Sequence, residues 1–143
     1  MELTMIYQST RNTSTEVTSA EAIVKGIATD GGLYIPKEQP QLSLDDIINL
    51  SNMTYRDRAC GVLGLFLSDF TSAELADCVS RAYTAEKFES DDIAPLHKLN
   101  DSAYVLELWH GPTCAFKDMA LQILPHLLTT SMRKTNVDKE VVI

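Results

Sequence analysis

Four short polar segments of one pattern divide the first half of the chain, and each is a Ser or Thr followed three residues later by an acid. The pairs are Thr18 with Glu21, Ser43 with Asp46, Thr54 with Asp57, and Thr71 with Glu74. In such a pair the hydroxyl accepts a backbone N–H of the first helical turn, and the acid suits the positive end of the helix. The pattern predicts a helix after each Ser or Thr, the first running to about Ala28, and therefore a mostly helical amino-terminal half.

Apolar spacing supports two of these helices. The residues after Thr54 that recur at three- and four-residue intervals are Tyr55, Ala59, Val62, Leu63, Phe66, Leu67 and Phe70. A second stripe, after Thr71, consists of Leu75, Cys78, Val79 and Ala82. Stripes with this period face a core, so we interpret both as packing surfaces and not as cofactor sites.

Short strands are expected between the helices. Residues 5–7, 33–35 and 103–106 are apolar or β-prone runs, and the second is closed by Pro36. Residues 140–143 read as the start of a further, buried strand. The fold class predicted from these runs is mixed α/β and helix-rich. A polar stretch around residues 90–95 suggests a domain change near Leu99, which divides the chain into 1–98 and 99–143.

Lys117 lies at a predicted strand–loop–helix junction. The strand at 103–106 precedes it, Gly111 and Pro112 predict a turn, and Asp118 suits the N-cap or first turn of the next helix. Pro125, about two turns further on, should kink or split that helix. A lysine of ordinary pKa, about 10.4, is almost always protonated at pH 7, but burial lowers that pKa and a helix amino end also disfavours the charge. Lys117 is therefore either an amine nucleophile or a solvated surface residue.

Composition excludes several functions. The net charge is −8 and no basic cluster occurs, which argues against a nucleic-acid partner. The three cysteines, Cys60, Cys78 and Cys114, have no metal-ligand spacing, and neither His97 nor His126 has a Cys or His partner at such spacing, so we expect no metal site. The first residues have neither a basic region nor a long apolar run, so we expect a cytoplasmic protein without a membrane partner.

Two separated motifs resemble the threonine synthases, a family of fold-type-II enzymes that depend on pyridoxal phosphate. The run 110–118, His-Gly-Pro-Thr-Cys-Ala-Phe-Lys-Asp, is similar to the cofactor-attachment motif of that family. Residues 7–11 and 19–36 resemble its amino-terminal signature. The resemblance implies that residues 1–98 form the amino-terminal domain of the family and that residues 99–143 begin its cofactor domain.

The resemblance also implies roles for individual residues. Lys117 would be the catalytic residue, forming the Schiff base with pyridoxal phosphate, and His110, Phe116 and Asp118 would lie at the cofactor. His110 could equally shape the loop alone. The complete enzyme would be a carbon–oxygen lyase that converts O-phosphohomoserine and water into L-threonine and phosphate.

Residues 9–11, namely Ser9, Thr10 and Arg11, are candidates for binding the substrate phosphate through hydroxyl and guanidinium donors. The alternative is a capped turn that carries a surface arginine. Relatives in this family are several hundred residues long, and the rest of the phosphate site is expected beyond Ile143. We therefore expect this chain to be a fragment of a longer enzyme.

Two other functions stay open. The chain by itself could be a catalytically inactive structural module that self-associates through apolar surface. It could also belong to a related pyridoxal-phosphate enzyme such as a threonine dehydratase, although the segments at 7–11 and 31–34 argue against that reading.

Overall fold

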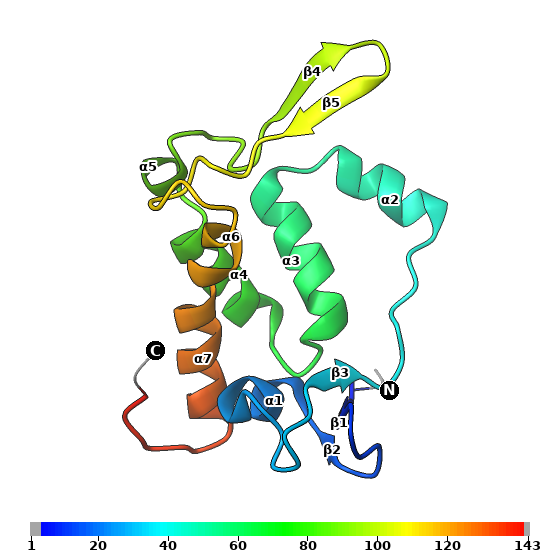
Figure 1. The fold of residues 1–143 in the computed structure, drawn as a ribbon, viewed down its shortest axis with the longest axis vertical. Coiled ribbons are helices and arrows are strands. Elements are labelled where there is room, and N and C mark those ends of the chain that lie inside the picture. Colours follow the sequence, from blue (N-terminus) through cyan, green and yellow to red (C-terminus); the bar gives the residue numbers. More distant parts are fainter. Residues whose placement is uncertain (1–3, 142–143) are drawn as a thin grey trace.

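The structure is a computed structural model that describes residues 4–141. Figure 1 shows a group of helices with a small sheet at one end and a hairpin at the other. The elements are β1 (Tyr7–Ser9), β2 (Glu16–Val17), α1 (Ser19–Lys25), β3 (Tyr34–Pro36), α2 (Leu44–Ser51), α3 (Tyr55–Phe66), α4 (Ser72–Ala82), α5 (Ala85–Phe88), β4 (Leu96–Asn100), β5 (Ala103–Leu106), α6 (Asp118–Leu121) and α7 (Leu124–Lys134). The predicted mixed α/β, helix-rich class is confirmed.

All four predicted helix starts are correct. Thr18, Ser43 and Thr71 each form a complete capping box with the acid three residues on. At Thr54 the side chain accepts the backbone N–H of Asp57 and donates to its carboxylate. The first helix is shorter than predicted and ends at Lys25, because Gly26 follows with φ 67°, a conformation that glycine adopts without strain.

The amino-terminal sheet is antiparallel and has the order β2-β1-β3. Its central strand begins at Tyr7, two residues later than predicted, and β2 was not predicted. The second sheet is the hairpin β4–β5, in which Leu96 lies opposite Leu106. The predicted strand at 103–106 is confirmed as β5. The predicted domain boundary near Leu99 falls within β4.

The hydrophobic core lies between α1, α3, α4 and α7. Its fully or nearly fully buried members include Cys78, Val79, Ala82, Phe88 and Ile93. The predicted face of α4 is buried in full. The predicted stripe on α3 is only partly correct: the helix ends at Phe66, and Val62 is 40% exposed because it lies off the packed face. Helix α1 packs against α7, about a hundred residues away in sequence.

Pro125 splits the helix that follows Lys117, as predicted. α6 ends at Leu121 and α7 begins at Leu124, which places Pro125 in the first turn of α7. A proline is tolerated there because the amide that it lacks would have no partner within the helix. The strand predicted at 140–143 is absent from its described part, Glu140 and Val141, whereas residues 142 and 143 lie outside the described residues.

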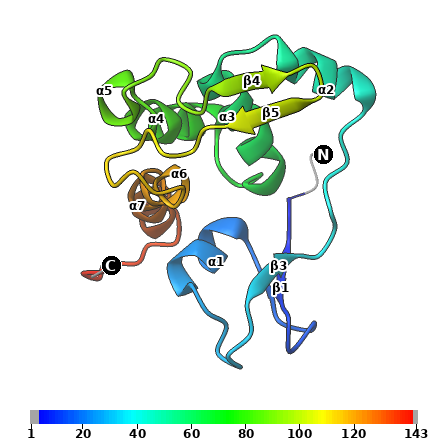
Figure 2. The same cartoon turned by 45° about the horizontal axis from the view of Figure 1, so that its top comes forward.

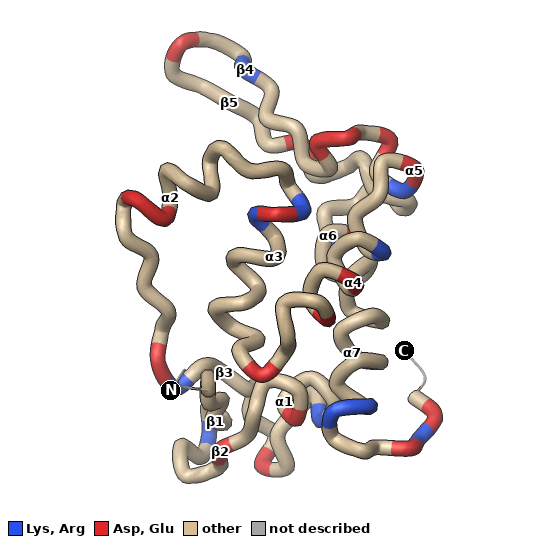
Figure 3. The backbone as a smooth tube through the Cα atoms, turned by 180° about the vertical axis from the view of Figure 1, so that it is seen from behind, with Lys and Arg blue, Asp and Glu red and all other residues tan. Residues whose placement is uncertain are grey.

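Figure 3 shows the backbone positions of the acidic and basic residues, and the basic ones are dispersed over several elements. Within residues 4–141, no group of three or more His, Cys, Asp or Glu side chains could hold a metal ion. No helix in the described part of the chain is long and apolar enough to cross a membrane.

Candidate functional site

Lys117 is the N-cap residue of α6, at the end of the loop that follows β5. This is the strand–loop–helix junction expected from the sequence. Lys117 is exposed to solvent, so burial does not lower the pKa of its amine, and the exposure agrees with the surface alternative left open above. The physical reason is that α6 is a single turn on the surface, and the loop before it carries the lysine outward.

A cavity of about 500 Å³ lies beside Lys117. Its apolar lining residues are Ala94, Leu106, Leu108, Phe116, Met119 and Ala120. Helix α3 contributes two further lining residues, Tyr55 and Arg58. Among residues 4–141, neither Lys117 nor Arg58 takes part in a salt bridge. The cavity therefore has a mostly apolar wall and two cationic side chains without an ionic partner in that range.

Sequence reasoning missed the part that α3 plays in this cavity. Tyr55 and Arg58 precede Lys117 by about sixty residues, and Tyr55 was interpreted only as a member of a packing stripe. No local motif marks either residue, since their place beside Lys117 depends on how α3 packs. That Arg58 lines this cavity can therefore be recognised only from the three-dimensional structure.

Tyr83 fixes α6 to the helices behind it. Its hydroxyl donates a hydrogen bond of 2.7 Å to the Met119 carbonyl, and its ring meets Tyr55 edge to face at 5.1 Å between centroids. Burial raises the pKa of Tyr83, so the hydroxyl keeps its proton as a donor at neutral pH. The hydrogen bond from Tyr83 therefore fixes the backbone at Met119, two residues after Lys117.

Asp118 is the first residue of α6 and is 0% exposed. Its Oδ2 accepts the Thr113 N–H at 2.8 Å and the Thr113 hydroxyl at 2.9 Å. Its Oδ1 is buried without a partner among the described protein atoms. The carboxylate predicted to lie at the cofactor is thus engaged inside its own loop, and it is not among the residues that line the cavity.

The other two cofactor candidates differ in position. Phe116 is 71% exposed and lines the cavity with Lys117. His110 is half-buried, its Nε2 lies 2.7 Å from Glu107 Oε2, and its ring stacks on Trp109. His110 does not line the cavity. Phe116 therefore lies at the same cavity as Lys117, whereas His110 contacts Glu107 and Trp109, which precede it in the loop.

The segment Ser9, Thr10 and Arg11 is bound to the turn around Asp30. Ser9 is fully buried and its hydroxyl donates to Asp30 Oδ1 at 2.8 Å, while Arg11 Nη1 donates to the Asp30 carbonyl at 3.1 Å. Thr10 Oγ1 accepts the Leu33 N–H at 3.0 Å. These contacts correspond to the capped-turn alternative.

Gly32 packs closely against the same segment, since a Cβ there would lie 2.1 Å from Ser9 Oγ. Hydrogen bonds from the Gly32 N–H and the Ser9 hydroxyl lower the pKa of Asp30. In Figures 1 and 2, β1 lies at the end of the molecule opposite the β4–β5 hairpin, so the structure does not bring residues 9–11 to Lys117.

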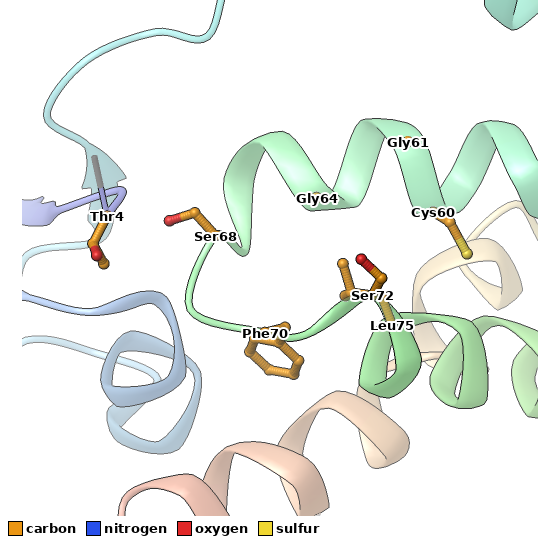
Figure 4. A pocket seen from close by; sticks show the side chains of 8 residues that line it. All are labelled: Thr4, Cys60, Gly61, Gly64, Ser68, Phe70, Ser72 and Leu75. Atoms are coloured by element: carbon orange, nitrogen blue, oxygen red, sulfur yellow. The ribbon is translucent and has the colours of Figure 1, made fainter. Parts of the chain in front are cut away.

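A larger cavity, of about 750 Å³, lies between α3 and α4 (Figure 4). Its lining residues are Thr4, Cys60, Gly61, Gly64, Ser68, Phe70, Ser72 and Leu75. None of them is a lysine, histidine or acid. Burial raises the pKa of the Cys60 thiol, which disfavours the reactive thiolate. This cavity has no group suited to carbonyl chemistry, so the candidate site is the one beside Lys117.

An exposed lysine at a strand–loop–helix junction, beside an apolar cavity, is an arrangement suited to an enzyme whose amine reacts with a carbonyl compound. Residues 6–83 match the family model described as the threonine synthase N terminus, which is more than half of the chain. The chain therefore belongs to the threonine synthase family.

Individual relatives agree with this assignment. The chain is 39% identical over 130 residues to the threonine synthase of Methylobacillus glycogenes, a match that covers 86% of this chain and 27% of that protein. The crystal structure of the threonine synthase of Brucella melitensis with bound pyridoxal phosphate superposes with a TM-score of 0.84 at 35% identity, covering 92% of this chain and 28% of that one.

The yeast threonine synthase superposes with a TM-score of 0.82 at 36% identity, covering 94% of this chain and 28% of the yeast chain. The chain thus spans between a quarter and a third of the length of these relatives.

Proposed function

We propose that this chain is the amino-terminal part of a pyridoxal-phosphate-dependent threonine synthase, a carbon–oxygen lyase. The complete enzyme would convert O-phosphohomoserine and water into L-threonine and phosphate. The observation that carries the proposal is Lys117, which lies beside an apolar cavity at a strand–loop–helix junction. The relative from Brucella melitensis, with its bound pyridoxal phosphate, supports the choice of cofactor.

The residues around Lys117 fit such a cofactor. Phe116, Leu106 and Leu108 offer apolar walls to a planar ring, and Lys117 offers an exposed primary amine. Arg58 adds a second cation on the same cavity, which suits ligands that carry phosphate. The sequence contains no Gly-rich phosphate loop, so we propose that the main phosphate contacts lie outside these 143 residues.

Lys117 would hold pyridoxal phosphate, and Phe116 would cover one side of the cavity and restrict water. When bound, pyridoxal phosphate withdraws electrons from the carbons next to the substrate amine. The Lys117 amine would also move protons at the α and β carbons of the substrate. In this role the exposure of Lys117 is an advantage, because the amine has to reach two positions in turn.

The test is a Lys117→Ala substitution in the complete enzyme. We expect turnover of O-phosphohomoserine to fall by at least ~10³-fold, which is typical for the loss of a positioned acid–base group. Lys98→Ala is the matched control, because Lys98 is paired with Asp101 in the hairpin and does not line the cavity. Turnover at the wild-type level in the Lys117 variant would refute the proposal.

A second function is favoured for the isolated chain, namely a structural module without activity. The observation behind it is the number of large apolar side chains at the surface, among them Leu44, Leu96, Leu99, Tyr104 and Leu106, each more than half exposed. Such a surface favours self-association. Sedimentation at several protein concentrations tests this, and a monomer throughout would contradict it.

Cofactor binding by the isolated chain is tested separately. After addition of pyridoxal phosphate and borohydride, peptide mapping identifies which lysines have been labelled. Scattered labelling is the result expected for a structural module, whereas stoichiometric labelling of Lys117 alone would show a partly competent site. The alternative enzyme is a threonine dehydratase. It is tested by giving threonine to the complete enzyme and measuring whether the 2-oxo acid forms. The cytoplasmic location stays a prediction.

A further inference from the structure

The loop from Gly111 to Asp118 carries a buried carboxylate directly beside the exposed Lys117. We propose that Asp118 is a positioning residue, which closes this loop through Thr113 and thereby fixes the point from which the Lys117 side chain extends. This inference rests on the proposed function, in which Lys117 is the cofactor lysine. It assigns Asp118 a different role from the direct cofactor contact expected from the sequence.

The first argument is the energetics of burial. An ionised carboxylate without water needs hydrogen bonds, and Thr113 gives Asp118 two of them, at 2.8 and 2.9 Å, to the same oxygen. Charge-assisted bonds of this kind are stronger than neutral ones. The Asp118 carboxylate and Thr113 therefore hold together the two ends of the segment 113–118, which are five positions apart.

The second argument is the shape of the loop. Cys114 has φ 56° and its N–H donates to the Gly111 carbonyl at 3.0 Å, and the Asp118 N–H donates to the Ala115 carbonyl at 3.0 Å. Two successive tight turns thus lead into α6. A non-glycine residue in the left-handed region is uncommon, so the conformation at Cys114 indicates that other contacts hold the loop.

The third argument is the fit at Gly111. A Cβ at this position would lie 2.5 Å from Asp118 Cβ and 2.6 Å from its Oδ2, so the carboxylate fills the space that a side chain would take. On the other side, the Lys117 carbonyl accepts N–H groups from Ala120 and Leu121 at 3.1 and 2.9 Å. The backbone of Lys117 is therefore fixed by contacts on both sides in the sequence, while its amine has no salt-bridge partner among residues 4–141.

The rival role, direct contact of Asp118 with cofactor or substrate, has less support. Oδ2 is engaged by Thr113, and Asp118 does not line the cavity that Lys117 and Phe116 share. The two roles predict different behaviour of Thr113. Positioning requires Thr113 as the partner of Asp118, whereas direct contact does not.

A double-mutant cycle in the complete enzyme tests the proposal with Thr113→Val, Asp118→Asn and both together. Each single variant should lower kcat by roughly 10–10²-fold, the scale of a misplacement of about 1 Å, with the substrate KM little changed. The double variant should be no worse than the poorer single one, because both changes break one contact. Thr113→Ser, which keeps the hydroxyl, should return kcat to near the wild-type value.

A readout independent of turnover is the rate at which pyridoxal phosphate labels Lys117 in the apoenzyme, trapped by borohydride and located by peptide mapping. We expect Thr113→Val and Asp118→Asn to slow labelling of Lys117 and to leave Lys98 unaffected. Circular dichroism shows whether each variant is folded. If Thr113→Val does not fold, Thr113→Ala, which also lacks the hydroxyl that bonds to Asp118, takes its place in the comparison.

Wild-type labelling of Lys117 in Thr113→Val, together with a loss confined to Asp118→Asn, would overturn the positioning role and favour direct contact. Failure of the proposed function looks different. In that case the wild-type enzyme itself shows neither turnover of O-phosphohomoserine nor preferential labelling of Lys117, whatever residue stands at 113 or 118.

Discussion

Gly111 offers a sharp test of how tightly the lysine loop is packed. In Gly111→Ala the new methyl group would lie 2.5, 2.6 and 2.9 Å from the Cβ, Oδ2 and Cγ atoms of Asp118. Contacts below 3 Å are not tolerated, so one of the two residues must move. Asp118 cannot swing away freely, because it is fully buried, begins α6 and is bonded to Thr113.

The expected cost follows from three contributions. Overpacking of a tight site costs about 1–3 kcal/mol. Weakening of the charge-assisted bonds to Asp118 adds to this, each being worth roughly 1.5–3 kcal/mol when intact. Replacement of glycine also restricts the unfolded chain, which offsets about 0.4–1 kcal/mol. We therefore expect Gly111→Ala to lower the free energy of unfolding by about 1–3 kcal/mol, within the range seen for disruptive single substitutions.

The assay is urea unfolding followed by far-ultraviolet circular dichroism, with Gly64→Ala as the matched control. Gly64 lies within α3, and a Cβ there would make an ordinary contact of 3.7 Å with Leu75 Cδ1. An alanine inside a helix is more favourable than glycine, so Gly64→Ala should raise stability by roughly 0.5–1 kcal/mol. If Gly111→Ala raised the free energy of unfolding as much as Gly64→Ala, the inference that Asp118 fills the space beside Gly111 would be wrong.

The other predictions concern the core, a helix start and the response to pH. Phe88→Ala removes a fully buried ring and should cost about 3–5 kcal/mol in thermal or urea unfolding; a cost below ~1 kcal/mol would contradict the packing. Asp69 accepts the Ala20 N–H at 2.9 Å, so Asp69→Ala should cost about 0.5–2 kcal/mol, as loss of a helix cap does, and unchanged stability would dismiss this contact. Because hydrogen bonds, the largest from Gly32, lower the pKa of Asp30, its stabilising effect is present above the unfolded-state pKa and is lost as pH falls through the lower, folded-state pKa. Asp30→Asn should accordingly flatten the fall in unfolding midpoint on acidification below about pH 4, and an unchanged profile would refute this.

Features encoded over a few residues could be predicted from the sequence. A helix start depends on a hydroxyl and an acid three residues apart, and all four were correctly located, including the cap at Thr54. The split at Pro125 was predictable for the same reason, since the missing amide acts within one turn. The strand β5 followed from its own β-prone residues.

Features that depend on distant parts of the chain were not predictable. The two-residue strand β2 exists only because β1 lies beside it. The place of Arg58 at the lysine cavity requires α3 to pack near α6. The sequence left Lys117 open between a buried and an exposed position, because the exposure of its apolar neighbours, such as Phe116, depends on how the loop lies on the fold.

The packing of α1 against α7 has a consequence for synthesis on the ribosome. The β2-β1-β3 sheet needs only the first 36 residues and can assemble early, because its strands are close in sequence. Helix α1 leaves the ribosome at about the same time, but its partner helix begins only at Leu124. Until roughly ninety further residues have been added, one face of α1 has no native partner, and such long-range closure is slow. A nascent chain at this stage should therefore be a better substrate for chaperones than one that already contains α7.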